Sequence, residues 1–346
     1  MKIDLHSHFY PREFFKLIEE ADSDFSFGVG TSGMRYIAYQ GARFFGLTEP
    51  MSDMDLRMEA MDRVGMDAAI LSIGPLPQFI KNVNQQIRMC RFLNETYAGL
   101  IEENPSRLGA YATVPMASPK AAIEEIERAI DGFGFNGVIL PSNIAGVYYD
   151  DPRFEGFLTE ADARKLCVFI HPLLAPANNT LRDFVLGPIL GFMFDTTISV
   201  SRLVFSGTLD RYPNIRWHIG HAGGTLPWLM ERIDNGWRDY AENRANIDEL
   251  PSTVIKRLYF DTVTFNPQTL NFLRDAVGAD HMVLGTDFPH PLGGIEKGVS
   301  TIQDLQIPTR EKEQIFSGTA LQILNNSESL ASRISLTTAQ ETTLVS

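Results

Sequence analysis

Short apolar runs alternate with stretches of helical periodicity along most of this chain. The runs are rich in branched side chains and are apolar at nearly every position, which is typical of parallel strands buried on both faces. Eight runs of this kind predict eight strands: Lys2–Leu5, Ala68–Ser72, Leu108–Val114, Gly137–Leu140, Cys167–Ile170, Ile215–Ile219, Leu258–Asp261 and His281–Leu284.

The segments between these runs have the apolar spacing of α-helices. In Ala121–Ile130, three isoleucines form one stripe, and Ser118 followed by Pro119 is a typical helix start. Eight strand and helix units within 346 residues predict an α/β protein with the (β/α)8 barrel architecture. In that architecture functional residues lie at the carboxyl ends of the strands.

Two connections are longer than a barrel requires. Residues 9–66 join the first two predicted strands through a segment rich in aromatics and glycine, and a long loop at that place should form a small lid over the barrel mouth. Residues 172–196 follow another strand. Four of their side chains could line an apolar pocket wall: Phe184, Phe192, Met193 and Phe194. Packing against the barrel or a partner subunit would explain each of them equally well. We expect one barrel domain over 1–326 and a poorly ordered tail over 327–346, where the apolar pattern ends.

Composition narrows the class of protein. The chain is 44% apolar, which suffices for a large core, and its net charge of -13 without a basic cluster argues against nucleic acid or an anionic membrane as partner. Cys90 and Cys167 stand far apart in apolar settings, which favours buried thiols in a reducing compartment. We find no secretory signal pattern and no apolar run near membrane-spanning length, so we predict a cytoplasmic protein.

Ligand-type side chains end several predicted strands. His6 and His8 stand two positions apart, and residues i and i+2 of a strand share a face; His171 and Asp287 follow two later strands. One such histidine is more often a half-buried structural residue, and one such aspartate is often a turn or cap residue. Their recurrence at the start, middle and end of the chain favours a metal site. Three imidazoles and a carboxylate suit Zn²⁺, with another divalent ion such as Mn²⁺ as a possibility.

His221 is the candidate general acid or base. It follows a predicted strand and precedes a glycine pair that begins a helix, where an imidazole and backbone N–H groups can face the barrel mouth together. His218 lies within the strand, which favours a structural role, and His281 begins the last strand at the opposite end of the barrel. His290 follows the last strand and is close enough to the barrel mouth for a role in the site to remain possible, although we predict no catalytic role for it.

These residues together carry a resemblance to a known family. The chain resembles the amidohydrolase superfamily, in the branch of 2-amino-3-carboxymuconate-6-semialdehyde decarboxylase and the related hydroxybenzoate-type and isoorotate decarboxylases. The matching segments are Met1–His8, Arg57–Asp62, Asp195–Thr197, His221–Gly224 and Leu284–Pro289. The resemblance implies a (β/α)8 barrel with one Zn²⁺ ion. It implies as ligands His6, His8, His171 and Asp287, with His221 as the acid or base.

Residues outside the metal set refine the resemblance. The fourth predicted strand is followed by Ser142 and Asn143 rather than by the lysine that bridges two metals in binuclear relatives, which favours one ion. The family's decarboxylase of the aminocarboxymuconate substrate uses an arginine from the first long loop, for which Arg43 is the candidate. That decarboxylase takes a second arginine from the partner subunit. At the matching position this chain has Tyr240, and Arg238 stands two residues earlier. The resemblance therefore implies a homodimer whose Arg238 or Tyr240 touches the partner's pocket.

We therefore predict a carboxy-lyase, a metal-dependent non-oxidative decarboxylase of a small aromatic or unsaturated carboxylic acid. No flavin, nicotinamide or pyridoxal fingerprint is evident, so the metal would stabilise the charge that develops when CO₂ departs, and His221 or Asp287 would deliver the proton. Candidate substrate-binding residues are Arg43, Phe192 and Arg238. A smaller aromatic acid with an ortho hydroxyl suits this set as well as, or better than, a dicarboxylate.

Three alternatives use the same site. A metal-dependent hydrolase would attack a lactone, amide or C–C bond with metal-bound hydroxide. A hydratase of an unsaturated dicarboxylate would need two or more arginines in the pocket, for which the candidates are Arg43, Arg57, Arg182 and Arg238. A barrel that only binds its ligand is the third alternative, and the complete set of metal ligands argues against it.

Overall fold

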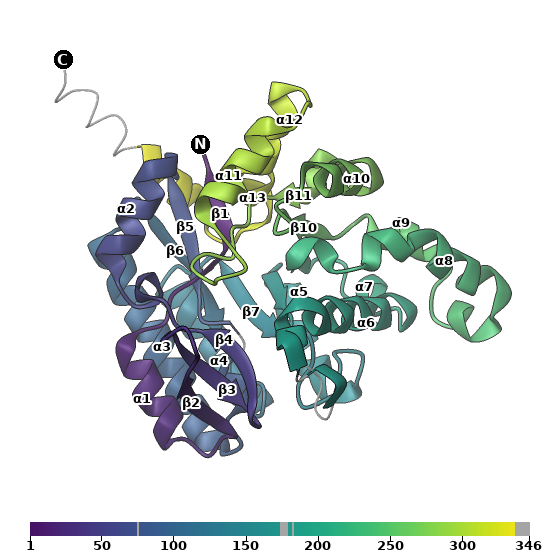
Figure 1. Ribbon diagram of the computed structural model, residues 1–346. Coiled ribbons are helices and arrows are strands. Elements are labelled where there is room, and N and C mark those ends of the chain that lie inside the picture. Colours follow the sequence, from purple (N-terminus) through teal and green to yellow (C-terminus); the bar gives the residue numbers. More distant parts are fainter. Residues whose placement is uncertain (75, 174–178, 182, 336–346) are drawn as a thin grey trace.

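The computed structural model describes residues 1–74, 76–173, 179–181 and 183–335 (Figure 1). Its centre is a sheet of eight parallel strands in which each strand pairs with the next one along the chain. The strands are β1 (Ile3–His8), β5 (Ala68–Ser72), β6 (Leu108–Thr113), β7 (Gly137–Pro141), β8 (Cys167–His171), β9 (Arg216–Ile219), β10 (Tyr259–Asp261) and β11 (Met282–Val283). Every predicted strand overlaps one of these, because buried parallel strands leave a local apolar signal.

Hydrogen bonds from the first strand to the end of the last one close the sheet into a barrel. Asp287 N donates to His6 O at 2.8 Å, and His8 N donates to Phe288 O at 2.8 Å. The predicted (β/α)8 barrel is therefore confirmed. All eight carboxyl ends meet at one mouth, which brings residues from distant parts of the chain together.

Helices connect the strands around the outside of the barrel (Figure 1). The longer ones are α2 (Met54–Val64), α3 (Val83–Glu103), α4 (Pro119–Ile126), α5 (Glu155–Ala163), α6 (Phe192–Phe205), α8 (Leu226–Asp239), α10 (Pro267–Val277) and α11 (Ile295–Asp304). Shorter ones are α7 (Thr208–Arg211), α9 (Pro251–Ile255), α12 (Thr309–Glu313) and α13 (Thr319–Ile323). The predicted helix start is confirmed, since the Ser118 side chain accepts a hydrogen bond from Ala121 N at 3.4 Å.

The long connection between β1 and β5 has its own secondary structure. It contains α1 (Arg12–Glu20) and an antiparallel sheet of β2 (Phe25–Val29), β3 (Arg35–Tyr39) and β4 (Ala42–Gly46), drawn in purple in Figure 1. The β4 residues from Arg43 to Gly46 line a cavity that also reaches His171 and Asp287. The connection therefore lies beside the barrel mouth.

The connection after β8 contains a long, apolar helical stretch. Asp183–Phe205 has a mean hydropathy of 1.5 and is long and apolar enough to cross a membrane. The sequence-based expectation that no apolar run approaches this length is therefore wrong. In this structure the stretch packs on the barrel. Asp195 accepts hydrogen bonds from Asn143 Nδ2 at 2.8 Å and from the Tyr148 hydroxyl at 2.9 Å. These bonds tie the stretch to the loop after β7, as expected for a barrel helix.

The segment after the last barrel helix differs from the poorly ordered tail that the sequence suggested. Residues 327–335 are helical, and they bury Leu330 and Ile334 in an apolar cluster with side chains of β1, β5, β6, β7, β8 and β11. Two buried side chains one helical turn apart are enough to hold a short helix against a core. Residues 336–346 of the predicted tail lie outside the described part of the chain.

Candidate metal centre and active site

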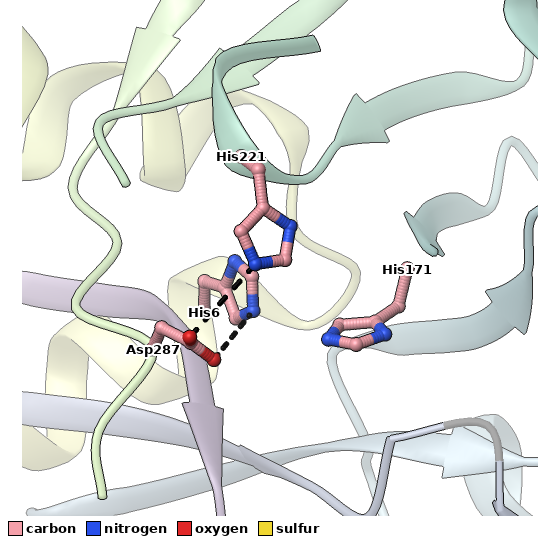
Figure 2. Close-up of side chains that lie close together, drawn as sticks. All are labelled: His6, His171, His221 and Asp287. Atoms are coloured by element: carbon pink, nitrogen blue, oxygen red, sulfur yellow. Dashed lines mark ion pairs between the residues drawn. The ribbon is translucent and has the colours of Figure 1, made fainter. Parts of the chain in front are cut away.

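Four side chains meet at the barrel mouth, where β1, β8 and the loop after β11 come together. The Nε2 atoms of His6 and His8 lie 3.1 Å apart, and Asp287 Oδ1 lies 3.4 Å from the first and 3.2 Å from the second. The His171 ring centroid is 5.3 Å from that of His6 and 5.0 Å from that of His8. Figure 2 shows three of these residues together with His221. All four ligand candidates are therefore neighbours.

These four side chains fit a divalent cation. The 3.1 Å between the facing nitrogens of His6 and His8 is close to the separation of about 3.3 Å that tetrahedral Zn–N bonds of about 2.0 Å would give. Burial lowers the pKa of His8 to about 3 and holds that of His171 well below its usual range, so both rings are neutral donors. Neutral imidazoles with a carboxylate are typical ligands of divalent transition metals.

The second ring nitrogen of each histidine is held by an oxygen of the protein. The pairs are His6 with the Asp261 carboxylate at 2.5 Å, His8 with the Ser72 hydroxyl at 2.9 Å and His171 with the Pro172 carbonyl at 3.0 Å. In metal sites such outer contacts fix the tautomer and leave Nε2 free for the ion. The three rings are therefore oriented for binding from Nε2.

Asp261, the last residue of β10, is the part of this site that the sequence interpretation missed. Besides His6 it accepts hydrogen bonds from the backbone nitrogens of His221 at 2.9 Å, Ala222 at 2.8 Å and Val263 at 3.0 Å. Burial alone would raise the pKa of Asp261, but the adjacent His6 lowers it to about 2. Its sequence signal is a single carboxylate at the end of a strand, without a surrounding motif.

At His6, one of the candidate ligands, a proton and a bound cation would compete for the same ring. Burial alone would lower the pKa of His6, but the carboxylates of Asp261 and Asp287 raise it to about 10. A cation that binds His6 Nε2 therefore displaces a proton, and metal affinity should increase with pH.

Asp261→Asn should weaken metal binding by about 10–100-fold, the usual effect of losing an outer-shell carboxylate. The asparagine keeps the size of the side chain but cannot hold His6 with a full negative charge. Competition with a chelator measures the affinity. The control is Asp275→Asn, which changes a carboxylate whose side chain is 72% exposed. Wild-type affinity in the Asp261 variant would show that His6 needs no such support.

His221 borders the same site on another side. Its Nε2 lies 3.8 Å from Asp287 Oδ2, and its Nδ1 is buried with no hydrogen-bond partner in the described structure. The backbone of both residues is left-handed, with φ of 53° and 52°, a conformation that is uncommon outside glycine, that His and Asp adopt more readily than most residues, and that concentrates at functional sites. Since Asp261 holds its backbone, His221 presents its ring to the cavity without needing a side-chain partner.

A cavity of about 540 Å³ opens above these residues and reaches His171, His221 and Asp287. This volume is within the range of small-molecule sites, about 300–1,000 Å³. Most of its wall is apolar or aromatic. Members of the wall include Phe44, Phe45, Leu76, Phe184, Phe192, Met193 and Leu292.

The residues suggested for substrate binding lie in different places. Arg43 and Phe192 line the cavity. Phe194 is 53% exposed and is not part of the cavity lining, so of the two interpretations offered for this residue the pocket wall is not the one observed. Arg238 lies on α8, where it pairs with Glu231 at 3.0 Å, and it does not line the cavity of its own chain.

The remaining polar residues near the barrel have packing roles. His218 is buried and stacks on Phe169 with the ring centroids 4.3 Å apart, as a structural histidine does. His281 stacks on Tyr259 with the ring centroids 5.0 Å apart. Arg57 is buried in α2 and donates to the Ser7 hydroxyl at 2.6 Å, which supports β1 between the two ligand histidines.

Comparisons with known proteins identify the family. The sequence model of the amidohydrolase family matches residues 3–325. This chain belongs to the amidohydrolase family. The resemblance noted from its motifs is therefore confirmed.

Several members of this amidohydrolase family are decarboxylases. The chain is 26% identical over 336 residues to 2-amino-3-carboxymuconate-6-semialdehyde decarboxylase of Dictyostelium discoideum, which covers 94% of this chain and 91% of the relative. It is 30% identical over 258 residues to γ-resorcylate decarboxylase of Rhodococcus jostii, with 68% and 77% covered. The crystal structure of a Polaromonas dihydroxybenzoic acid decarboxylase, with manganese and the inhibitor 2-nitroresorcinol bound, superimposes with a TM-score of 0.78 at 25% identity and covers 93% of this chain and 96% of that one.

Proposed function

We propose that this amidohydrolase is a metal-dependent decarboxylase that releases CO₂ from a small aromatic acid without oxidation. The observation that carries the proposal is the group of potential metal ligands, with His221 open to the same cavity. The relatives described above are decarboxylases, which favours this reaction over the hydrolase and hydratase alternatives.

We propose that one divalent ion is held by His6, His8, His171 and Asp287. Zn²⁺ suits three imidazoles and a carboxylate, and Mn²⁺, which the Polaromonas relative binds, accepts the same ligand types. When bound, the ion would stabilise negative charge on substrate oxygens as a Lewis acid. Elemental analysis of the purified protein tests this assignment, and a protein that binds neither ion would contradict it.

His221 and Asp287 are the groups that can supply the proton the reaction needs. A new C–H bond forms at the ring carbon that carries the carboxylate, and the C–C bond to that carboxylate then breaks. The electron pair of the C–C bond returns to the ring, and CO₂ leaves. Both side chains border the cavity, and their Nε2 and Oδ2 atoms are 3.8 Å apart, so a ring carbon that lies in the cavity against this pair is within reach of either.

The cavity favours an aromatic monoacid over a dicarboxylate. Arg43 is the one arginine in the described cavity lining; its guanidinium lies 5.2 Å from the Tyr36 ring, and no described carboxylate pairs with it. Arg57 is buried in α2, Arg238 lies on the outer surface, and Arg182 lies outside the described residues. We therefore propose that Arg43 pairs with a negatively charged group of the substrate and that the aromatic wall holds its ring, which carries an ortho hydroxyl.

Measuring CO₂ release tests the proposed function. The metal-loaded protein is screened with hydroxybenzoates and unsaturated acids near neutral pH, and a panel of lactones and amides serves as the control. A decarboxylase loses CO₂, whereas a hydrolase adds water. Turnover of the lactone panel without CO₂ release from any acid would contradict the proposal.

We propose that residues 9–66 act as a lid within a single barrel domain, which the buried Leu330 and Ile334 extend past the predicted end at residue 326. The support is the position of β4, which lines the cavity through Arg43, Phe44 and Phe45. We also propose a cytoplasmic location, because Cys90 and Cys167 are buried free thiols that need no oxidising compartment.

We propose a homodimer, based on exposed apolar side chains on and beside α6 and α8. These side chains are Ile189 (45% exposed), Phe194 (53%), Ile198 (49%), Trp228 (76%) and Tyr240 (63%). Phe194 and Ile198 lie on α6 and Trp228 on α8, while Ile189 precedes α6 and Tyr240 follows α8. Exposed large apolar and aromatic residues of this kind are typical of a protein interface. Arg238 is near the end of the same α8, and it would lie within reach of a partner placed on this face.

Mixing two inactive variants should restore part of the activity if the site is shared. One chain carries Arg238→Ala with Tyr240→Ala, and the other carries His221→Asn. A mixed dimer then has one site with an intact His221 and an intact Arg238 from its partner, so up to half of the sites in mixed dimers recover. A protein that sediments as a monomer, or no recovery despite proven subunit exchange, would rule out the shared site.

A further inference from the structure

The loop after Asp287 brings a second histidine, His290, into the cavity. His290 Nε2 lies 2.8 Å from the Tyr10 hydroxyl, and both side chains line the cavity with His221. His290 N also donates to Asp287 O at 2.9 Å, so the turn that places the carboxylate also places this histidine. The mechanism proposed above leaves the Tyr10–His290 pair without a role.

His290 and His221 flank the ligand group from different sides. The His290 ring centroid is 4.9 Å from that of His8, whereas the His221 centroid is 4.8 Å from that of His6 and 5.5 Å from that of His171. A ligand ring above the metal site therefore has one histidine on each side. His221 then faces one edge of the reacting centre, and His290 faces another.

The Tyr10–His290 pair is held in place before a substrate binds. Tyr10 is 2% exposed, and its backbone nitrogen donates to Met51 O at 2.7 Å. The Phe45 ring packs edge-on against His290 with the ring centroids 4.8 Å apart. Since the Tyr10 hydroxyl occupies Nε2, the nitrogen left for a ligand is Nδ1, to which no described residue hydrogen-bonds.

We propose that the Tyr10–His290 pair recognises a phenolic hydroxyl next to the carboxylate of the substrate. This inference rests on the proposed function and adds a determinant of substrate choice. A hydroxyl can donate to or accept from His290 Nδ1, whereas a hydrogen or methyl at that position would displace water and leave the nitrogen unpaired in a largely apolar cavity. The enzyme should therefore prefer acids with a hydroxyl on each side of the carboxylate over acids with one.

Binding of inert analogues tests this inference without turnover. Calorimetry with the metal-loaded protein compares 2-nitroresorcinol, which has two hydroxyls beside the nitro group, with 2-nitrophenol, which has one. The wild type should bind the first about tenfold or more tightly, because a buried polar group left unpaired is costly. His290→Phe should reduce this ratio to within about twofold, and Tyr10→Phe should reduce it partly, because the imidazole is then free to turn away.

The control is His281→Phe, the same substitution at the stacked histidine outside the cavity, and it should keep the wild-type ratio. Metal content and thermal unfolding establish that each variant is folded and loaded. A wild-type protein without preference, or an unchanged ratio in folded His290→Phe, would overturn the inference. Release of CO₂ from hydroxybenzoates by the same wild-type preparation reports separately on the proposed function.

Discussion

His6→Ala and His171→Ala are each expected to remove most of the bound metal and, with it, the activity. Three remaining ligands hold a divalent ion poorly and leave its charge undercompensated. The loss of affinity should exceed the roughly 100-fold that an outer-shell change produces. The metal-to-protein ratio after dialysis against a weak chelator measures the effect.

The two variants should differ in stability. His6→Ala leaves Asp261, a buried carboxylate, without its imidazole partner at 2.5 Å, which adds a folding cost. His171→Ala leaves only the Pro172 carbonyl without its hydrogen bond, so it isolates the effect on the metal. His281→Ala, outside the metal site, is the matched control. Full metal occupancy in both ligand variants would rule out the proposed ligand set.

His221→Asn is expected to keep the metal while kcat falls by about 10²–10⁴, the usual contribution of one positioned general acid or base. Asparagine suits this test because it tolerates the left-handed backbone at this position, where φ is 53°. The hydrogen bond from His221 N to Asp261 at 2.9 Å is a backbone contact, and the substitution preserves it.

His221 could be a metal ligand instead of the acid or base, because its ring lies within reach of His6, His171 and Asp287. Measuring the metal content together with kcat distinguishes these two roles. Loss of metal in the variant would show that His221 is a ligand. Retained metal with unchanged turnover would leave Asp287 as the proton donor. His281→Asn, the same substitution at the stacked histidine outside the cavity, provides the control for handling and metal loading.

The strands and the positions of the candidate metal ligands could be predicted from local patterns. A parallel strand buried on both faces needs an unbroken apolar run, and a polar residue directly after such a run must lie at the carboxyl end of the barrel. His6, His8, His171 and Asp287 therefore become neighbours once the barrel is recognised, whatever their separation in the chain. The sequence of residues 327–335 carries a weaker signal for its helix, because only two apolar residues, Leu330 and Ile334, hold the helix against the core.

The sequence by itself determined the barrel, the edge at which the candidate site lies and the types of side chain gathered there, since these follow from the period of the side chains. Only the tertiary structure decided that Asp261 supports His6, 255 positions away, and that Tyr10 holds His290, 280 positions away. It also decided that Phe192 faces the cavity while Phe194 faces outward. The physical reason is that a hydrogen bond depends on the positions of two side chains to within a few tenths of an ångström, and barrel closure sets those positions.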